Sequence, residues 1–137
     1  MGSAMFSREI KNNASNILNL CNRKNIKIVT AESCTGGLIA VCLTEVPGSS
    51  SVVEGGFVTY SNNLKNSILL VKLEQIEQHG AVSEAVARSM AEGALLISKA
   101  DIAIACTGVA GPDGGTSLKP VGLVHLACAS RNYQKSK

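Results

Sequence analysis

An apolar run, IKIVTA at residues 26–31, breaks into Glu-Ser-Cys-Thr-Gly-Gly and then returns to apolar residues at helical spacing. A strand that hands over directly to a helix needs such a turn, with glycine for the tight backbone and a hydroxyl to cap the helix. The segment around Ser33 therefore predicts a strand–turn–helix unit. The same position suits a nucleophile, because the hydroxyl of Ser33 would project from the end of the strand.

The rest of the chain continues this alternation of strands and helices. Apolar residues three and four positions apart predict helices, and β-prone or continuous apolar runs predict strands. We expect helices over residues 6–25, 36–46, 61–71, 73–80 and 84–97, and strands over 26–31, 52–62, 101–108 and 121–130. Strands that are separated by helices and are apolar on both faces are typical of a sheet between two helical layers. The predicted fold class is α/β, three-layer, with a mostly parallel or mixed sheet and helices on both faces.

Two segments support sharper local predictions. Gly55 and Gly56, inside the β-prone run, indicate a bulge or a close approach by another backbone or a ligand. Ser83 should cap the helix that follows it, because its hydroxyl can accept from an amide of the first turn. We expect the buried stripe of that helix to consist of Val86, Met90, Ala94 and Ile97.

The length and composition indicate one folded domain. The chain has 137 residues, of which 45% are hydrophobic and 17% charged, so it can bury a core and does not have a disordered composition. We expect a single domain over residues 6–137. The start, MGSAM at 1–5, resembles the remnant of an expression tag, and the polar end, RNYQKSK, is expected to be frayed.

Charge and cysteine patterns exclude several classes of function. The net charge of +3 comes from 13 basic and 10 acidic residues that are scattered along the chain, so no basic stripe indicates nucleic-acid binding. The apolar runs fall short of the roughly 20 residues that a membrane span needs. The five cysteines form no CxxC pair and show no metal-ligand spacing with His79 and His125. We therefore expect reduced thiols in a cytoplasmic protein, without a metal site.

Three loops follow strand ends and would meet at one edge of a parallel sheet, where ligands of such folds bind. They are ESCTGG, TYSNNLK and CTGVAGPDGG. Their convergence would combine the hydroxyl of Ser33, the amine of Lys65 and many backbone N–H groups. No histidine lies in these loops, so Lys65 is the available base if desolvation or a nearby cation lowers its pKa. Tyr60 could relay a proton or orient that amine.

Each of these residues also has a purely structural interpretation. Ser33 could be only a capping hydroxyl, and Lys65 could be an exposed lysine of a helix. Cys34 could replace Ser33 as nucleophile, but without a partner histidine a packing role is favoured. Glu32 either pairs with a cation in the site or is a solvated carboxylate of the turn.

The glycine-rich segments do not match the motifs of cofactor-binding loops. SCTGG lacks the GKS or GKT ending of a phosphate-binding nucleotide loop, and TGVAGPDGG is not the dinucleotide fingerprint. Neither an NTPase nor a dehydrogenase is indicated, and no cofactor is expected. Backbone amides of these loops, or the hydroxyls of Ser49 and Ser50, could still hold a single phosphate.

Taken in order, the motifs resemble those of a known family. TAESCTGGLIA, VPGSS, GGFVTYSNNLK, HGAVSEAVA, MAEGAL, and TGVAGPDGGT followed by KPVGLV are similar to the motif series of the CinA C-terminal domain family, the nicotinamide-nucleotide amidases. The resemblance implies a bacterial, cytoplasmic hydrolase that converts nicotinamide mononucleotide to nicotinate mononucleotide and ammonia in pyridine nucleotide recycling. It also implies a serine–lysine centre without metal or cofactor, a small nucleotide substrate and a homo-oligomer.

The resemblance assigns roles to individual residues. It implies that Ser33 is the nucleophile, with Lys65 and Tyr60 as its catalytic partners. As a hypothesis, Lys65 deprotonates Ser33, which attacks the carboxamide, while backbone amides near the helix start hold the oxyanion. The implied substrate-binding residues are Thr35, Gly36, Ser49, Ser50, Asn62, Thr107, Gly108, Ala110 and Gly111, with Pro112 completing the TGxAGP motif.

The sequence departs from the family pattern at its end. Family members continue past the strand at VGLVHLACA with a further strand and a C-terminal helix that carries arginine, whereas this sequence stops at Lys137. We therefore expect a C-terminal truncation that removes a sheet neighbour and a phosphate-binding cation. Two alternatives to the amidase follow: a catalytically impaired nucleotide-binding or assembly domain of the same fold, and a serine amidase or esterase with another small substrate.

Overall fold

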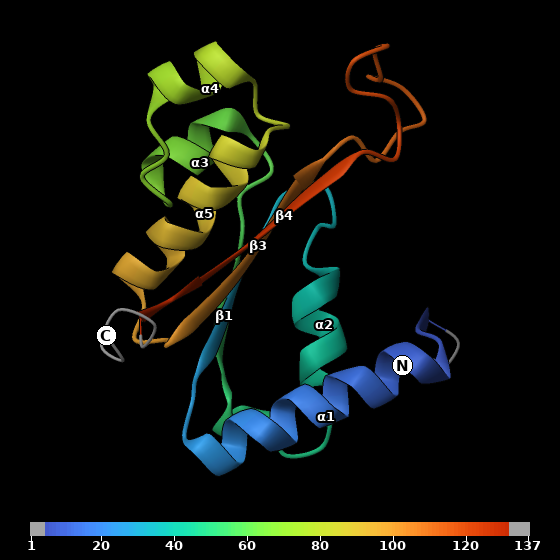
Figure 1. The fold of residues 1–137 in the computed structure, drawn as a ribbon, viewed down its shortest axis with the longest axis vertical. Coiled ribbons are helices and arrows are strands. Elements are labelled where there is room, and N and C mark those ends of the chain that lie inside the picture. The colour runs from blue at the N-terminus through green and yellow to red at the C-terminus, as the bar shows by residue number, and fades with distance from the viewer. Residues whose placement is uncertain (1–4, 132–137) are drawn as a thin grey trace.

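The computed structural model describes residues 5–131; the tag-like residues 1–4 and the tail at 132–137 lie outside the described residues. A four-stranded sheet in the order β2-β1-β3-β4 forms the centre. Its strands are β1 (Ile28–Glu32), β2 (Val53–Val58), β3 (Ile102–Gly108) and β4 (Val124–Ser130) (Figure 1). The helices are α1 (Arg8–Lys24), α2 (Leu38–Thr44), α3 (Asn62–Ser67), α4 (Leu73–His79) and α5 (Glu84–Ile97), with a 3₁₀ turn, η2 (Ser49–Ser51).

The sheet is mixed, which confirms the predicted fold class. Strand β1 pairs in parallel with both β2 and β3, whereas β4 pairs antiparallel with β3. Helices separate β1, β2 and β3 along the chain and allow each strand to restart from the same edge. Only an irregular loop at 109–123 joins β3 to β4, so β4 returns in the opposite direction.

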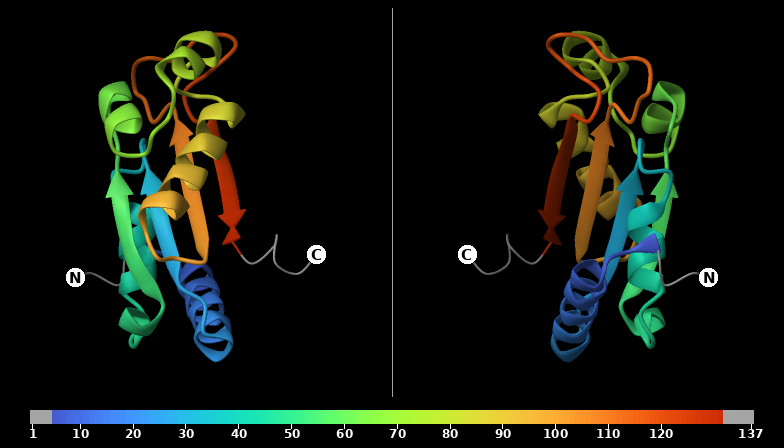
Figure 2. Two further views of the ribbon diagram at one scale, coloured as in Figure 1. Left: turned by 90° about the vertical axis from the view of Figure 1, so that its left-hand side faces the viewer. Right: turned by 90° about the vertical axis from the view of Figure 1, so that its right-hand side faces the viewer.

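Helices cover both faces of the sheet (Figure 2). Helix α5 packs on one face, where its Val86, Met90 and Ala94 join the apolar side chains of β1 and β3 in the larger core. Helices α1 and α2 cover the other face, through a core that includes Leu18 and Leu43. The predicted position of Ile97 in the buried stripe is wrong: its side chain is 42% exposed, because it is the last residue of α5, where the chain turns toward β3.

Two helices are shorter than the sequence predicts. Helix α2 begins at Leu38 and not at residue 36, because Gly36 and Gly37 have φ angles of 63° and 106°, outside the helical region. Helix α3 ends at Ser67 and not at residue 71, and Leu70 has a φ of 63°, which reverses the chain before α4. In contrast, Ser83 caps α5 as predicted, with its Oγ accepting from the amide of Val86 at 3.2 Å.

Of the two alternatives predicted from the glycines of the β-prone run, the bulge is present, whereas the neighbour at Gly56 is neither another backbone nor a ligand. The register between β1 and β2 shifts after Ile28, which pairs with Val53, because Val29 pairs with Gly55; this confirms a bulge. At Gly56, an added Cβ would lie 2.6 Å from Oγ1 of Thr30. The close approach therefore comes from a side chain of the neighbouring strand.

The expectation that the polar end frays is wrong at its first residue. The amide of Arg131 donates to the carbonyl of Asp101 at 2.8 Å, and its Nε donates to the carbonyl of Ala100 at 3.0 Å. Its guanidinium also donates to the carbonyl of Leu95 near the end of α5. Five donors in a fixed fork can serve several carbonyls at once, and here they tie β4 to α5 and to the start of β3.

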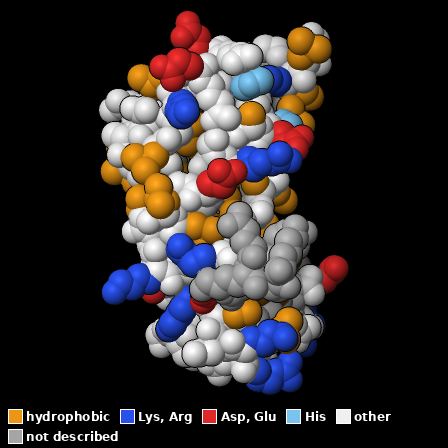
Figure 3. All heavy atoms as spheres, turned by 60° about the vertical axis from the view of Figure 1, so that its left-hand side comes forward, with side chains coloured by type: hydrophobic (Ala, Val, Ile, Leu, Met, Phe, Trp, Pro, Cys, Tyr) orange, Lys and Arg blue, Asp and Glu red, His pale blue; other side chains and the backbone are white. Residues whose placement is uncertain are grey.

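The helices and the surface charges bear on membrane and nucleic-acid binding. No helix within residues 5–131 is long and apolar enough to cross a bilayer. On the face drawn in Figure 3, basic and acidic side chains are interspersed, with hydrophobic side chains between them.

Candidate active site

Ser33 lies in the turn that follows β1, at the carboxyl edge of the three parallel strands. Its amide donates to the carbonyl of Cys106 on β3 at 3.1 Å. On the other side, the amide of Thr59, just after β2, donates to the carbonyl of Glu32 at 2.9 Å. The predicted strand–turn–helix unit is confirmed, and both neighbouring strands fix the backbone at the serine.

Lys65 approaches Ser33 from the short helix α3. Ser61 caps this helix, because its Oγ accepts from the amide of Leu64 at 3.0 Å. The helix places Lys65 inward, and only 1% of the residue is exposed. The interpretation of Lys65 as an exposed helical lysine is therefore wrong.

The amine of Lys65 has three oxygen neighbours. Its Nζ lies 2.8 Å from Oγ of Ser33, 2.9 Å from the carbonyl oxygen of Thr59 and 3.1 Å from that of Tyr60. A neutral amine has two N–H donors and one lone pair. When the two carbonyls accept those N–H groups, the remaining lone pair faces the hydroxyl of Ser33, which is the orientation a general base requires.

Electrostatics at this amine favour the neutral form. Burial lowers the pKa of the Lys65 ammonium, while the nearby thiols of Cys34 and Cys106 act in the opposite direction. The desolvation effect is the larger one. The structure thus provides the desolvation that the sequence argument required for a lysine base.

Tyr60 contacts the amine through its main chain. Its carbonyl is one of the three neighbours of Nζ of Lys65, whereas 69% of the residue is exposed. Orientation of the amine at this position therefore comes from the backbone. A proton relay through the phenol stays a prediction.

The three loops predicted to converge do so around a pocket of about 310 Å³. They bring together eight residues to which the resemblance assigns a catalytic or binding role: Ser33, Tyr60, Asn62, Lys65, Thr107, Gly108, Ala110 and Gly111. Ala81 and Val82, in the α4–α5 connection, also line the pocket but were not predicted. The hydroxyl of Thr107 donates to the carbonyl of Ala81 at 2.8 Å, which links this connection to the end of β3. A threonine at a strand end gives no sequence signal for such a partner.

Other predicted binding residues do not line this pocket; they are Thr35, Gly36, Ser49, Ser50 and Pro112. Ser49 and Ser50 belong to η2, just before β2, whose first residue pairs with Ile28 at the start of β1. Ser33 follows the far end of β1, five residues and roughly 16 Å further along the strand direction. Within one chain these two serines lie at the opposite edge of the sheet.

Glu32 corrects two sequence interpretations. It is fully buried, and its carboxylate accepts from the hydroxyl of Thr35 at 2.7 Å and from the amides of Ile39 and Ala40 at 2.8 and 3.0 Å. It is therefore neither a partner of a cation in the pocket nor a solvated turn carboxylate. Because Glu32 occupies these amides at the start of α2, they cannot serve as the oxyanion site.

The turn itself offers the remaining amides beside the nucleophile. Within residues 5–131, the backbone N–H groups of Cys34 and Thr35 donate to no other residue. They directly follow Ser33 in the chain. An oxyanion formed at Ser33 could therefore accept from these turn amides, which no other described residue occupies, rather than from those of the helix.

The thiol of Cys34 lines the same pocket but suits nucleophilic attack poorly. Burial raises its pKa, and the neighbouring Cys106 raises it further, whereas its own backbone amide and Lys65 act in the opposite direction. The thiolate is the reactive form, and a raised pKa reduces its fraction. The geometry favours Ser33 over Cys34 as nucleophile.

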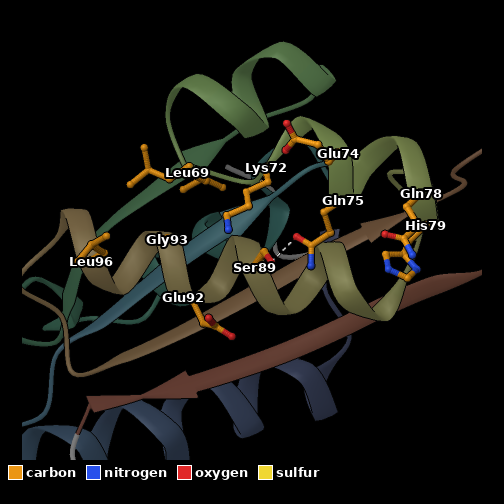
Figure 4. A pocket seen from close by; sticks show the side chains of 11 residues that line it. Leu69, Lys72, Glu74, Gln75, Gln78, His79, Ser89, Glu92, Gly93 and Leu96 are labelled. Carbon is orange, nitrogen blue, oxygen red and sulfur yellow. Dashed lines mark hydrogen bonds between the residues drawn. The ribbon is translucent and has the colours of Figure 1, made fainter.

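A larger cavity, of about 550 Å³, lies between α4 and α5 (Figure 4). Its polar lining includes Ser89, whose Oγ donates to Oε1 of Gln75 at 2.6 Å, and Lys72. The hydroxyl of Ser89 donates to this amide oxygen and, among residues 5–131, forms no hydrogen bond with a lysine, histidine or carboxylate, unlike the hydroxyl of Ser33 in the smaller pocket. Among residues 5–131, no three His, Cys, Asp or Glu side chains cluster as a metal site would require.

The fold and the site together define a class of protein: three-layer α/β domains with a buried serine–lysine pair at the carboxyl edge of the sheet. A model of one family, the CinA C-terminal domain, matches residues 10–137. The chain belongs to this family.

Relatives and solved structures agree with the assignment. The chain is 54% identical over 127 residues to a CinA-like protein of Colwellia psychrerythraea, covering 93% of this chain and 29% of that protein. A CinA-like protein of Chlorobium phaeobacteroides is 58% identical over 109 residues, covering 80% and 26%. The chain thus spans less than a third of the length of these curated relatives.

Two crystal structures have the same fold. A competence/damage inducible protein from Agrobacterium tumefaciens superposes with a TM-score of 0.92 at 50% identity, covering 96% of this chain and 79% of that one. A CinA superfamily protein from Escherichia coli gives a TM-score of 0.85 at 36% identity, covering 93% and 75%. The named motifs and the described fold therefore lead to the same family.

Proposed function

We propose that this domain is a nicotinamide-nucleotide amidase that hydrolyses nicotinamide mononucleotide to nicotinate mononucleotide and ammonia. The observation that carries the proposal is the 2.8 Å contact between Nζ of Lys65 and Oγ of Ser33 inside a pocket. A buried serine–lysine pair is chemistry for acyl transfer, because the amine can accept the serine proton without a histidine. The resemblance to the family motifs indicates which substrate this pair acts on: the carboxamide of a nicotinamide nucleotide.

The reaction follows from the pair. Neutral Lys65 accepts the hydroxyl proton of Ser33 as Oγ attacks the carboxamide carbon, and the carbonyl oxygen becomes an oxyanion next to the turn amides. The Lys65 ammonium then returns its proton to the leaving nitrogen, so that ammonia departs and an acyl-serine remains. Water, deprotonated by the same amine, cleaves the ester and restores Ser33.

The pocket suits the reactive end of such a substrate. Its volume of about 310 Å³ is at the lower end of the roughly 300–1,000 Å³ usual for small-molecule sites. Asp113 supplies its one carboxylate among the described residues, and that charge is complementary to a cationic pyridinium ring. A positive ring also makes the attached carboxamide more electrophilic.

One observation favours the alternative, a catalytically impaired nucleotide-binding or assembly domain. Among the described residues that line the pocket, Lys65 is the one basic side chain. A phosphate would then be held by backbone amides of the glycine loop, without a second cation. Binding and turnover therefore have to be measured separately. The expected homo-oligomer and cytoplasmic location stay predictions.

The test is ammonia release from nicotinamide mononucleotide by the parent chain and by Ser33→Ala. We expect release by the parent and none by the variant, with nicotinate mononucleotide as the second product. Nucleotide binding by both proteins without release by either would support the binding-domain alternative. Preferential turnover of an unrelated small amide in direct competition would instead indicate a serine amidase of other specificity.

A further inference from the structure

Glu32 is a buried carboxylate that the proposed reaction does not use. It is the last residue of β1, directly before Ser33, and it is not among the residues that line the pocket. An ionised carboxylate is strongly destabilised in a core unless hydrogen bonds compensate for lost water. The position of Glu32 beside the nucleophile and the hydrogen bonds that keep it buried suggest a role for its side chain.

The carboxylate binds the far side of the nucleophile's turn. Oε1 accepts from the hydroxyl of Thr35 and the amide of Ile39, at 2.7 and 2.8 Å, and Oε2 accepts from the amide of Ala40 at 3.0 Å. Thr35 is in the turn, whereas Ile39 and Ala40 are in the first turn of α2. One side chain thus spans the segment from residue 32 to residue 40 and closes it into a loop.

Thr35 extends this connection to the next strand. Its Oγ1 lies 3.0 Å from Sγ of Cys106, on β3. A hydroxyl has one proton, which Thr35 gives to Glu32, so the thiol of Cys106 is the donor in the second contact. The carbonyl of the same Cys106 accepts from the amide of Ser33, so both ends of the network meet at one residue.

We propose that Glu32 is a positioning residue that holds the Ser33 hydroxyl against Lys65. This inference rests on the proposed function, because it assigns Glu32 a part in the reactivity of that serine. The turn that joins Ser33 to α2 contains Gly36 and Gly37, both with positive φ, and glycines there leave the backbone free to adopt other conformations. On the helix side, the amide of Gly36 donates to the carbonyl of Ser33 at 3.1 Å and the amide of Leu38 donates to that of Thr35 at 3.2 Å. These bonds join near neighbours in the chain, and the Glu32 carboxylate adds the side-chain link that holds the turn to Ile39 and Ala40 of α2. A displacement of about 1 Å at a reacting group can lower a rate by roughly 100-fold.

The chemistry of the site specifies a carboxylate of this length. All three neighbours are donors, and a carboxylate is an acceptor at both oxygens. In Glu32→Gln, the amide nitrogen would face a donor, either the N–H of Ala40 or the groups that now bind Oε1. In Glu32→Asp, the side chain is one methylene shorter and would lose its reach to α2.

The experiment measures the reactivity of Ser33 directly. In a fluorophosphonate probe, the serine oxygen attacks phosphorus, so that a P–O bond forms, fluoride leaves and Lys65 takes the hydroxyl proton. The second-order labelling rate therefore reports how well Lys65 activates Ser33, whatever the natural substrate is. We expect Glu32→Gln to lower this rate by about 10- to 100-fold. The pH at which labelling reaches half of its maximum should stay unchanged, because the charges that act on Lys65 are those of Cys34 and Cys106.

Controls separate positioning from general loss of stability. Leu43→Ala removes a buried side chain of α2 that packs in the core with Leu18 and Ile28, and it should lower stability while the labelling rate per folded molecule is retained. Thr35→Val removes the hydroxyl that donates to Glu32 and should label several-fold more slowly than the parent. Ser33→Ala gives the blank.

Each outcome of the labelling experiment either supports or overturns the positioning role of Glu32. A parent-like labelling rate for folded Glu32→Gln would overturn the positioning role, as would a lack of Ser33 labelling in the parent itself. Equal rate losses in Glu32→Gln and Leu43→Ala would also overturn it. If labelling depends on Glu32 but the parent releases no ammonia from nicotinamide mononucleotide, the proposed function fails and the positioning role stands.

Discussion

The carbonyl of Thr59, just after β2, lies 2.9 Å from Nζ of Lys65. Lys65 belongs to α3, the next helix along the chain, and its amine is thus hydrogen-bonded to the segment that precedes this helix. Together with the carbonyl of Tyr60, that of Thr59 leaves one direction free on a neutral amine, and Ser33 lies there. The base is therefore oriented by backbone atoms, which no side-chain substitution removes.

The pH dependence of turnover should follow Lys65. Because burial lowers the pKa of its ammonium, the neutral base should form below the ordinary lysine range near pH 10.4, and kcat should rise with pH to a plateau. Lys65→Met should lose about 100-fold or more and show no such rise, since general bases contribute roughly 10²–10⁴-fold. A rate profile measured from pH 6 to 10 tests both points. Retention of the rise in Lys65→Met would assign it to another group.

The same burial predicts a pH dependence of stability. The folded state has a lowered pKa at Lys65, so below that pKa the cost of burying the charged amine is fully present. Between the folded pKa and about 10.4 the unfolded state binds more protons, and the free energy of unfolding contributed by Lys65 rises with pH. Urea titrations at several pH values should show the parent gaining stability relative to Lys65→Met from pH 7 to 10. If the difference in free energy of unfolding between the parent and Lys65→Met stayed constant or fell with pH, the lowered pKa of Lys65 in the folded state would be contradicted.

Cys34 should react slowly with alkylating agents despite lining the pocket. Burial, with the neighbouring Cys106, raises the pKa of its thiol, so little thiolate is present near pH 7. Iodoacetamide should modify folded Cys34 at least about tenfold more slowly than it does in the urea-unfolded chain. Peptide mass spectrometry over time measures this rate. Labelling at the unfolded rate would show that the environment does not suppress the thiol.

Asp113 should affect binding of a cationic substrate more than the chemical step. Its carboxylate lines the pocket but is exposed, and exposed ion pairs contribute only about 0.2–1 kcal/mol. Asp113→Asn should therefore raise KM for nicotinamide mononucleotide roughly two- to fivefold and leave kcat within twofold. An equal change for an uncharged dihydropyridine analogue would show that charge is not the cause.

Gly93 should tolerate no side chain. A Cβ at this position of α5 would overlap the carbonyl of Leu69, so α5 and the chain before α4 would have to separate. Gly93→Ala should lower the free energy of unfolding by at least about 2 kcal/mol. Gly55→Ala is the matched control, because a Cβ there meets no atom within 4 Å, and it should change stability by less than about 0.5 kcal/mol. Equal effects of the two variants would contradict the packing argument.

The sequence predicted the pocket because strand order in a parallel sheet determines which loops meet. Ser33, Lys65 and the loop after β3 could be placed at one edge from the alternation of strands and helices alone. Ser83 and the ends of α4 and α5 follow from local capping rules, which act over a few residues.

The remaining features depend on distant partners that a local pattern does not contain. Glu32 caps α2 seven and eight residues ahead of itself, and only the assembled turn shows that its carboxylate points away from the pocket. The burial of Lys65 needs Thr59 and Ser33 around it. Ser49 and Ser50 were assigned to the pocket by motif resemblance, but in a parallel sheet the segment before a strand lies at the edge opposite the segment after it.

Strand β4 runs antiparallel to β3 and therefore carries the chain from the pocket edge of the sheet to the opposite edge. Val124 pairs with Gly108 at the pocket edge, whereas Ser130 pairs with Ile102 at the start of β3. Seven residues of antiparallel strand span roughly 24 Å. Arg131, just after β4, lies at the edge of the sheet opposite the Ser33 pocket, so a label placed there would leave the pocket open to the solution.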